Sequence, residues 1–218
     1  MEFGGDKKKG RSVLSSAENR LKNWTVPRLP KWLTTYHLTL TTVAWSVVNI
    51  LLAFNIRQKP VLLWWVSLMI VLQYLTDLFD GELGRRRNTG LIKWGFYMDH
   101  FLDYLFLCSL VFVGYRLAPD GLKIWCFGLL VIVGGFMVNS FLSFAATNVF
   151  EIYRYGIGPT EFRLAIILIN TFIFFFGTGA LWLFLPLTVV IGLAALGVNT
   201  FQIQKKLWQI DMAARKEN

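Results

Sequence analysis

The sequence predicts an all-α integral membrane protein, a six-transmembrane-helix bundle with a short N-terminal interfacial amphipathic helix. The chain of 218 residues is 55% hydrophobic and 16% aromatic, with a mean hydropathy of +0.51, which is unusual for a soluble domain. A helix needs about 20 predominantly apolar residues to cross a bilayer. Six stretches approach or exceed this length, at 38–55, 61–77, 94–115, 122–147, 163–180 and 183–203.

The segment before the first span is expected to lie at the membrane surface. Ser15-Ser-Ala-Glu18 has the spacing of a capping box, which opens a short helix that ends near Trp24. In this helix apolar Leu21 and Trp24 accompany basic residues. A helix with one apolar and one basic face typically lies along a membrane, so we expect an interfacial anchor here.

The ends of two later spans are marked by particular residues. The second span is short and runs into Asp77, which indicates that its helix continues beyond the membrane surface. Between the fifth and sixth spans, Gly177, Gly179 and Pro186 interrupt a nearly continuous apolar run, and we place a break there. The expected division is a cytoplasmic or interfacial segment at 1–35, a six-helix domain at 36–205 and a cytoplasmic tail at 206–218.

Charge predicts the orientation of the bundle. All but four of the 22 Lys and Arg residues fall in the N-terminal segment, the second-to-third connection, the fourth-to-fifth connection and the C-terminal tail. The exceptions are Arg57, Lys59, Arg116 and Lys123. Because cytoplasmic loops are enriched in Lys and Arg, both termini and the end of the bundle near Asp77 are predicted to be cytoplasmic. The basic residues behind the net charge of +9 lie mainly in the segments predicted for one side of the membrane. This distribution indicates contact with anionic membrane lipids and no nucleic acid.

Four aspartates hold fixed spacings near the ends of the second and third spans. The sequence runs Asp77-Leu-Phe-Asp80-Gly81-Glu-Leu-Gly84-Arg85, then nine residues, then Gly95-Phe-Tyr-Met-Asp99-His100-Phe-Leu-Asp103. On a helix, Asp77 and Asp80 are i,i+3 neighbours, with β-carbons roughly 5–6 Å apart. Asp99 and Asp103 are i,i+4 neighbours on one stripe. Two helices that face each other through these stripes would gather four carboxylates, which is a ligand set that Mg²⁺ prefers.

This spacing closely resembles the signature of the CDP-alcohol phosphotransferase family, membrane enzymes that make phospholipids from cytidine-diphosphate-activated donors. The resemblance covers the motif at 77–103 and, more loosely, the six-span plan. It implies that Asp77, Asp80, Asp99 and Asp103 bind two divalent ions, Mg²⁺ or Mn²⁺. Asp103 is also implied as the catalytic base that takes the proton of the acceptor hydroxyl. Two such ions neutralise a pyrophosphate and stabilise the attacking and leaving oxygens.

The same resemblance implies a nucleotide-binding set beside the metal ligands. Gly81 and Gly95 are implied to lack side chains so that cytidine approaches the backbone. Arg85 is implied to offer its planar donor fork to phosphate. Gly84 stands where the family usually has alanine, and because both residues are small we expect little consequence. Asp77 and Asp99 complete the set.

His100 and Glu161 bear on the choice of substrate. His100 follows Asp99 directly, and the fourth-to-fifth connection ends in Gly156-Ile-Gly-Pro-Thr160-Glu161-Phe-Arg163. Both features resemble the choline and ethanolamine phosphotransferase branch, in which such a histidine and glutamate assist the deprotonation of diacylglycerol. The alternatives are a polar interfacial role for His100 and solvated charges at Glu161 and Arg163.

The direction of transfer is open between two schemes that both release cytidine monophosphate. His100 and Glu161 favour CDP-choline or CDP-ethanolamine as donor and diacylglycerol as acceptor. In the alternative, CDP-diacylglycerol donates a phosphatidyl group to serine, inositol or glycerol phosphate, and Arg154 and Arg163 are available to bind a phosphorylated acceptor. The partners are thus a CDP-linked donor and a lipid or alcohol acceptor. The family resemblance also implies a possible homodimer.

An ion-coupled transporter is a remote third hypothesis, because carboxylates within a six-helix bundle also occur in transporters. A transport path would need polar groups at several depths of the membrane. The charged residues instead cluster at one edge, and the spans carry mainly Asn139, Asn170 and Asn199 as polar residues elsewhere. This distribution favours an enzyme.

Overall fold

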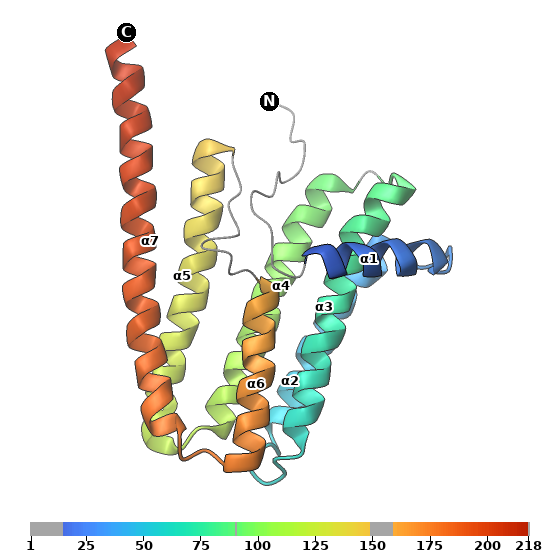
Figure 1. Ribbon diagram of the computed structural model, residues 1–218, viewed down its shortest axis with the longest axis vertical. Coiled ribbons are helices and arrows are strands. Elements are labelled where there is room, and N and C mark those ends of the chain that lie inside the picture. The colour runs from blue at the N-terminus through green and yellow to red at the C-terminus, as the bar shows by residue number, and fades with distance from the viewer. Residues whose placement is uncertain (1–14, 90, 149–158, 218) are drawn as a thin grey trace.

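The computed structural model describes residues 15–89, 91–148 and 159–217, and all regular secondary structure in these residues is helical (Figure 1). Two short 3₁₀ turns, η1 (Val26–Arg28) and η2 (Asp120–Leu122), connect longer elements. The α-helices are α1 (Ser15–Thr25), α2 (Thr35–Ala53), α3 (Leu62–Arg87), α4 (Ile92–Leu117), α5 (Lys123–Thr147), α6 (Pro159–Phe176) and α7 (Leu181–Glu217).

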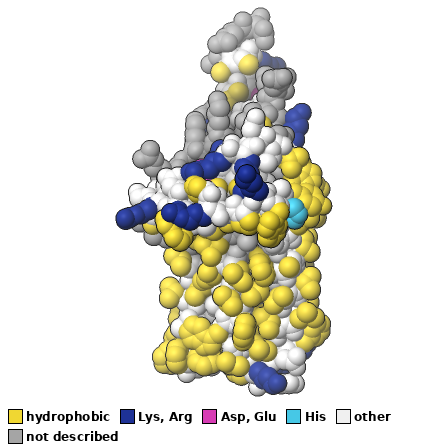
Figure 2. Space-filling model, turned by 90° about the vertical axis from the view of Figure 1, so that its right-hand side faces the viewer, with side chains coloured by type: hydrophobic (Ala, Val, Ile, Leu, Met, Phe, Trp, Pro, Cys, Tyr) yellow, Lys and Arg dark blue, Asp and Glu magenta, His cyan; other side chains and the backbone are white. Residues whose placement is uncertain are grey.

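Six of these helices, α2 to α7, are long and apolar enough to cross a membrane. The predicted six-helix architecture is therefore confirmed, and it fits a multi-pass membrane protein. Figure 2 shows the face that carries α1, where a broad apolar surface lies below a band of basic side chains at the level of that helix. Lipid-facing apolar side chains below a basic headgroup zone are the pattern expected of a membrane protein.

The bundle is built around α2, α3 and α4. α2 packs against both α3 and α4, α6 packs against α3, and α5 packs against α4. α7 packs mainly against α5, so these two helices form one side of the molecule (Figure 1). Buried apolar side chains such as Ile70 of α3, Phe106 of α4 and Ile173 of α6 form one shared core. This core fixes the relative position of the helices whose upper ends carry the acidic residues.

Buried amides join the helices within the membrane. Asn49 of α2 donates to Ser109 Oγ of α4 at 3.2 Å, and Asn170 of α6 donates to Ser67 Oγ of α3 at 3.1 Å. Such bonds satisfy polar groups that have no water available in the bilayer. Asn49 and Asn170 thus form helix-to-helix hydrogen bonds, as expected for a structural role.

α3 continues past Asp77 to Arg87, as its sequence predicts, and ends at Asn88 in the left-handed conformation (φ 48°).

The sixth span differs from the expected one at Pro186 and at its C-terminal end. Gly177, with φ +75°, follows the end of α6, whereas Pro186 lies inside α7 and does not end it. α7 runs on to Glu217, so most of the expected tail at 206–218 continues the helix of the sixth span. The division of the chain into three parts and the pairing of two copies stay predictions.

The predicted N-terminal helix is present as α1, which lies across the upper part of the bundle at a steep angle to the other helices (Figure 1). Trp24 on this helix is exposed. Arg87, at the end of α3, holds the segment between α1 and α2, because it donates hydrogen bonds to the carbonyls of Leu29, Pro30 and Leu33. α1 is thereby anchored next to the end of α3.

Candidate active site

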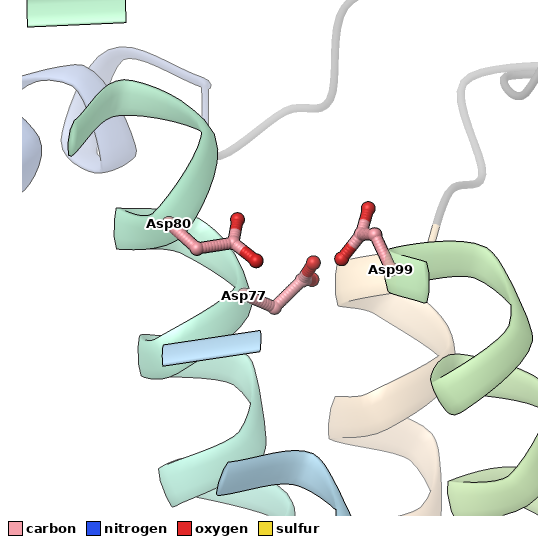
Figure 3. Close-up of side chains that lie close together, drawn as sticks. All are labelled: Asp77, Asp80 and Asp99. Carbon is pink, nitrogen blue, oxygen red and sulfur yellow. The ribbon is translucent and has the colours of Figure 1, made fainter. Parts of the chain in front are cut away.

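Three aspartates converge at the upper end of the bundle. Asp77 and Asp80 come from α3 and Asp99 comes from α4, and one carboxylate oxygen of each lies within 4.8 Å of those of the others. Figure 3 shows the three side chains pointing toward one another across the space between the two helices. Oxygen atoms this close, from three acidic groups, suit a divalent cation and would repel one another without a positive charge between them.

α2 holds Asp80 in place. The side chain of Thr39 donates to Asp80 Oδ2 at 2.9 Å, and Thr35 Oγ1 donates to the Asp80 backbone carbonyl at 3.3 Å. Asp80 is buried, so these bonds replace water contacts that the carboxylate and the helix end would otherwise make. Thr39 could not be predicted from the sequence, because its role depends on how α2 packs against α3.

Gly84 allows the close approach of α2. A β-carbon at Gly84 would lie 3.1 Å from Thr35 Oγ1, which is tighter than an ordinary contact. Alanine at this position would therefore require Thr35 to shift slightly, so glycine and alanine are not fully interchangeable here. By contrast, among the described residues a β-carbon at Gly95 would meet nothing within 4 Å, and one at Gly81 would meet only Arg85 Nη1, at 3.6 Å. Protein packing does not require glycine at these two positions, which leaves space for a ligand beside them.

Asp103 lies next to this group but has a different partner. Its Oδ1 accepts a hydrogen bond from Gln73 Nε2 at 2.7 Å. Gln73 is buried in α3, one turn before Asp77, and its Oε1 has no hydrogen-bond partner among the described residues. Sequence reasoning missed Gln73, although a polar residue four positions before Asp77 lies on the same helix face.

Replacement of Gln73 by leucine is expected to lower kcat by about 10- to 100-fold with little change in the KM of the nucleotide donor. The bond from Gln73 orients Asp103 but does not reach the donor, and leucine fits an apolar span without an unpaired amide. Steady-state kinetics of the purified variant would measure this. Gln58→Leu, in the exposed connection at the other end of the bundle, is the matched control. An unchanged kcat in Gln73→Leu would show that the amide does not orient Asp103.

Arg163 is the cation of the site. From α6 its Nη2 donates to Asp77 Oδ2 at 2.8 Å and lies 3.8 Å from Asp103 Oδ1. Its side chain is only 12% exposed, so the interpretation of Arg163 as a solvated charge does not hold. The guanidinium carbon lies 5.7 Å from the centre of the Tyr74 ring. A buried guanidinium between two carboxylates offsets their repulsion and carries donor groups suited to phosphate.

His100 and Glu161 lie close to this cluster along their helices. His100 Nδ1 is 2.7 Å from the Phe96 carbonyl and 3.9 Å from Asp99 Oδ2, and its ring packs against those of Phe96 and Phe141. Glu161 is half-buried in the first turn of α6, two residues before Arg163. Arg154 and the start of the Gly156–Thr160 stretch lie outside the described residues.

Arg85 pairs with an acidic residue of its own helix. Its Nη2 forms an ion pair with Glu82 Oε2 at 2.9 Å, and its side chain is 68% exposed. Arg86 also pairs with Glu82, at 2.7 Å. Arg85 thus contacts its own helix, whereas Arg163 contacts Asp77 and Asp103. The role of Arg85 toward phosphate stays a prediction.

Comparison with known families identifies a match over most of the chain. A family model described as CDP-alcohol phosphatidyltransferase matches residues 28–199, which is more than three quarters of the chain. Comparison with curated proteins finds no significant match.

Proposed function

The chain belongs to the CDP-alcohol phosphatidyltransferase family, and from this premise we propose that the acidic cluster of α3 and α4 is its catalytic site. Members of the family are transferases of substituted phosphate groups that synthesise phospholipids in the membrane from a CDP-alcohol donor and an alcohol or lipid acceptor. The family is metal-dependent. The convergence of Asp77, Asp80 and Asp99 is the observation that carries the assignment.

The donor set fits hard divalent cations. Three carboxylates whose oxygens lie within 4.8 Å of one another match the oxygen ligands that Mg²⁺ and Mn²⁺ prefer. We propose two ions, held by Asp77, Asp80 and Asp99 together with Asp103. When bound, they would supply charge neutralisation at the pyrophosphate and at the leaving cytidine monophosphate.

The protein side chains have separate roles in the proposed reaction. Asp103 accepts the proton of the acceptor hydroxyl, oriented by the bond from Gln73. Arg163 donates to a non-bridging phosphate oxygen of the donor from guanidinium N–H groups other than the one bonded to Asp77. Gly81 and Gly95 leave room for the cytidine beside the helices.

For the direction of transfer, we propose CDP-choline or CDP-ethanolamine as donor and diacylglycerol as acceptor. The support is the position of His100, whose ring lies beside Asp99 at the end of the cluster. A lipid hydroxyl in the bilayer is a poor nucleophile, so a second base near neutral pKa helps to remove its proton. Glu161, at the start of α6, is proposed for the same role.

A second direction is favoured by a different observation. The guanidinium of Arg163 lies in the acidic cluster and offers an anionic acceptor a charged partner within the site. In this scheme Arg163 would bind the phosphate of glycerol phosphate or the carboxylate of serine instead of the donor phosphate, whereas the neutral hydroxyl of diacylglycerol offers no anionic group to it. In that case CDP-diacylglycerol would donate a phosphatidyl group to the water-soluble alcohol.

The two directions are distinguished by their products. Purified protein is incubated with labelled CDP-choline, CDP-ethanolamine or CDP-diacylglycerol, each with diacylglycerol, serine, inositol or glycerol phosphate, and the lipid products are identified by mass spectrometry. We expect a phospholipid from a CDP-amino-alcohol and diacylglycerol, with loss of product on chelation and recovery with Mg²⁺ or Mn²⁺. His100→Ala should reduce this transfer about tenfold or more. If CDP-diacylglycerol is the only one of the three donors that yields a phospholipid, and His100→Ala does not change that rate, the second direction is established.

We also propose that the acidic cluster and both termini face the cytoplasm. The basic residues in the last turn of α3 lie at the same end of the bundle as the aspartates, and so does Arg163 near the start of α6, as the positive-inside rule requires of a cytoplasmic face. Modification of an introduced cysteine at Thr89 by a membrane-impermeant reagent in sealed, right-side-out cells would contradict this orientation.

A further inference from the structure

The carboxylate of Glu18 joins α1 to the membrane bundle. Its Oε1 accepts hydrogen bonds from the Tyr74 hydroxyl of α3 at 3.1 Å and from Thr160 Oγ1 of α6 at 2.9 Å. One side chain thus links three helices that are far apart in the sequence. The capping-box spacing assigns Glu18 a local role at the start of α1, but its side chain reaches across to the bundle.

Both partners of Glu18 lie one helical turn from an active-site residue. Tyr74 precedes Asp77 by three residues on α3, and Thr160 precedes Arg163 by three residues on α6. Asp77 and Arg163 are themselves joined at 2.8 Å. The junction at Glu18 and the ion pair at Asp77 therefore connect the same two helices at neighbouring levels.

Tyr74 contacts both this junction and Arg163. The Tyr74 ring lies 5.7 Å from the guanidinium carbon, while its hydroxyl is held by Glu18. An arginine side chain has many rotamers and loses considerable conformational entropy when it is fixed in one of them. A ring that is itself immobilised restricts the guanidinium more than a mobile ring does.

We propose that Glu18 is a positioning residue for the active site: by holding Tyr74 and Thr160, it keeps the guanidinium of Arg163 between Asp77 and Asp103. The interfacial helix α1 is then part of the catalytic architecture as well as a membrane anchor. The proposal rests on the proposed function only in assigning Arg163 to a phosphate of the donor.

The affinity for Mn²⁺ in the absence of nucleotide reports the position of Arg163, because the guanidinium and the ion both bind Asp77. Glu18→Ala and Glu18→Gln both remove the charge, but only glutamine retains an oxygen that accepts from Tyr74 and Thr160. Titration calorimetry on the full chain in detergent compares the two. We expect the alanine variant to bind Mn²⁺ about fivefold more tightly than the glutamine variant, because a released guanidinium competes less for Asp77.

The same comparison in an Arg163→Leu background isolates the path through Arg163. There the alanine and glutamine variants should agree within about twofold, since no guanidinium remains to be positioned. Tyr74→Phe keeps the ring and loses the hydroxyl that Glu18 holds, so it should also bind Mn²⁺ more tightly than the wild type. This variant provides the test if Glu18→Ala fails to fold. Asn19→Ala, at an exposed neighbouring position of α1, is the control and should match the wild type.

Equal Mn²⁺ affinities of Glu18→Ala and Glu18→Gln would overturn the proposal, as would a difference that persists in the Arg163→Leu background. Turnover of the wild type, measured in parallel, separates the two levels of inference. The expected Mn²⁺ pattern without turnover of any CDP donor contradicts the proposed function and leaves the positioning role intact. Turnover without the pattern contradicts the positioning role alone, and a wild type that binds no Mn²⁺ contradicts both.

Discussion

Asp80→Asn is expected to reduce cytidine monophosphate release by about 1,000-fold or more, equivalent to ~4 kcal/mol of transition-state stabilisation. Asp80 is buried in the cluster with Asp77 and Asp99, so it has the ligand position with the least access to compensating water. An amide has no negative charge to offset a divalent cation. Because asparagine still accepts the bond from Thr39, the helix packing should survive.

The measurement combines nucleotide release with metal affinity and thermal unfolding of the purified variant. Asp120→Asn makes the same chemical change at an exposed carboxylate at the opposite end of the bundle and should keep full activity. Asp80→Asn with normal turnover, or with normal Mg²⁺ dependence, would remove Asp80 from the site. The unfolding midpoint shows whether Asp80→Asn is still folded. If it is not folded, Asp99→Asn replaces it as the test variant.

Arg163→Leu is expected to have the second largest effect, on stability as well as on activity. Removal of one partner of a buried ion pair costs roughly 3–5 kcal/mol, because the carboxylates of Asp77 and Asp103 then lack their cation. Loss of a charged donor to the transferred phosphate should lower kcat by about 100- to 1,000-fold. Arg163→Lys retains the charge but not the planar fork, so it should recover stability better than activity.

Divalent metal distinguishes this explanation from a general packing defect. If Arg163 neutralises the aspartates, Mg²⁺ should replace it as counter-charge and raise the unfolding midpoint of Arg163→Leu more than that of the wild type. Arg57→Leu, which loses an exposed pair with Asp120, is the control and should show neither effect. A destabilised Arg163→Leu that Mg²⁺ does not rescue would contradict the role as counter-charge.

The sequence predicted the helices well because membrane spans depend on local properties. Length and apolarity identify a span wherever it packs. The end of the sixth span was the exception, since polar residues beyond 203 mark the exit from the bilayer but not the end of the helix. Lys205, Lys206 and the residues after them are good helix formers, and neither glycine nor proline follows Gly197 to stop the helix.

The site was predicted only as far as one motif reaches. Asp77 and Asp80 share one stripe of their helix, and Asp99 and Asp103 share one stripe of the next, so spacing predicts each pair. The family resemblance implies that the two pairs face each other. Contributions from α1, α2 and α6 depend on which helices pack together, and no periodicity encodes that. Thr39, Glu18 and the inward position of Arg163 therefore emerged only from the structure.

Gln73 is a different case, since the sequence did carry a signal for it. Gln73, Asp77 and Asp80 follow one another at i, i+4 and i+7, which places all three on one face of α3. An amide inside an apolar span is costly unless it is bonded. These two facts together indicate a polar partner near the aspartates.

The central claim is that carboxylates of α3 and α4 bind divalent ions beneath a CDP-linked donor. Anomalous scattering from crystals grown with Mn²⁺ and a cytidine nucleotide tests it most directly. The account predicts anomalous peaks at about 2.0–2.4 Å from carboxylate oxygens of Asp77, Asp80 and Asp99. Catalytically active protein whose Mn²⁺ peaks lie elsewhere, with these three side chains bound to none of them, would contradict it.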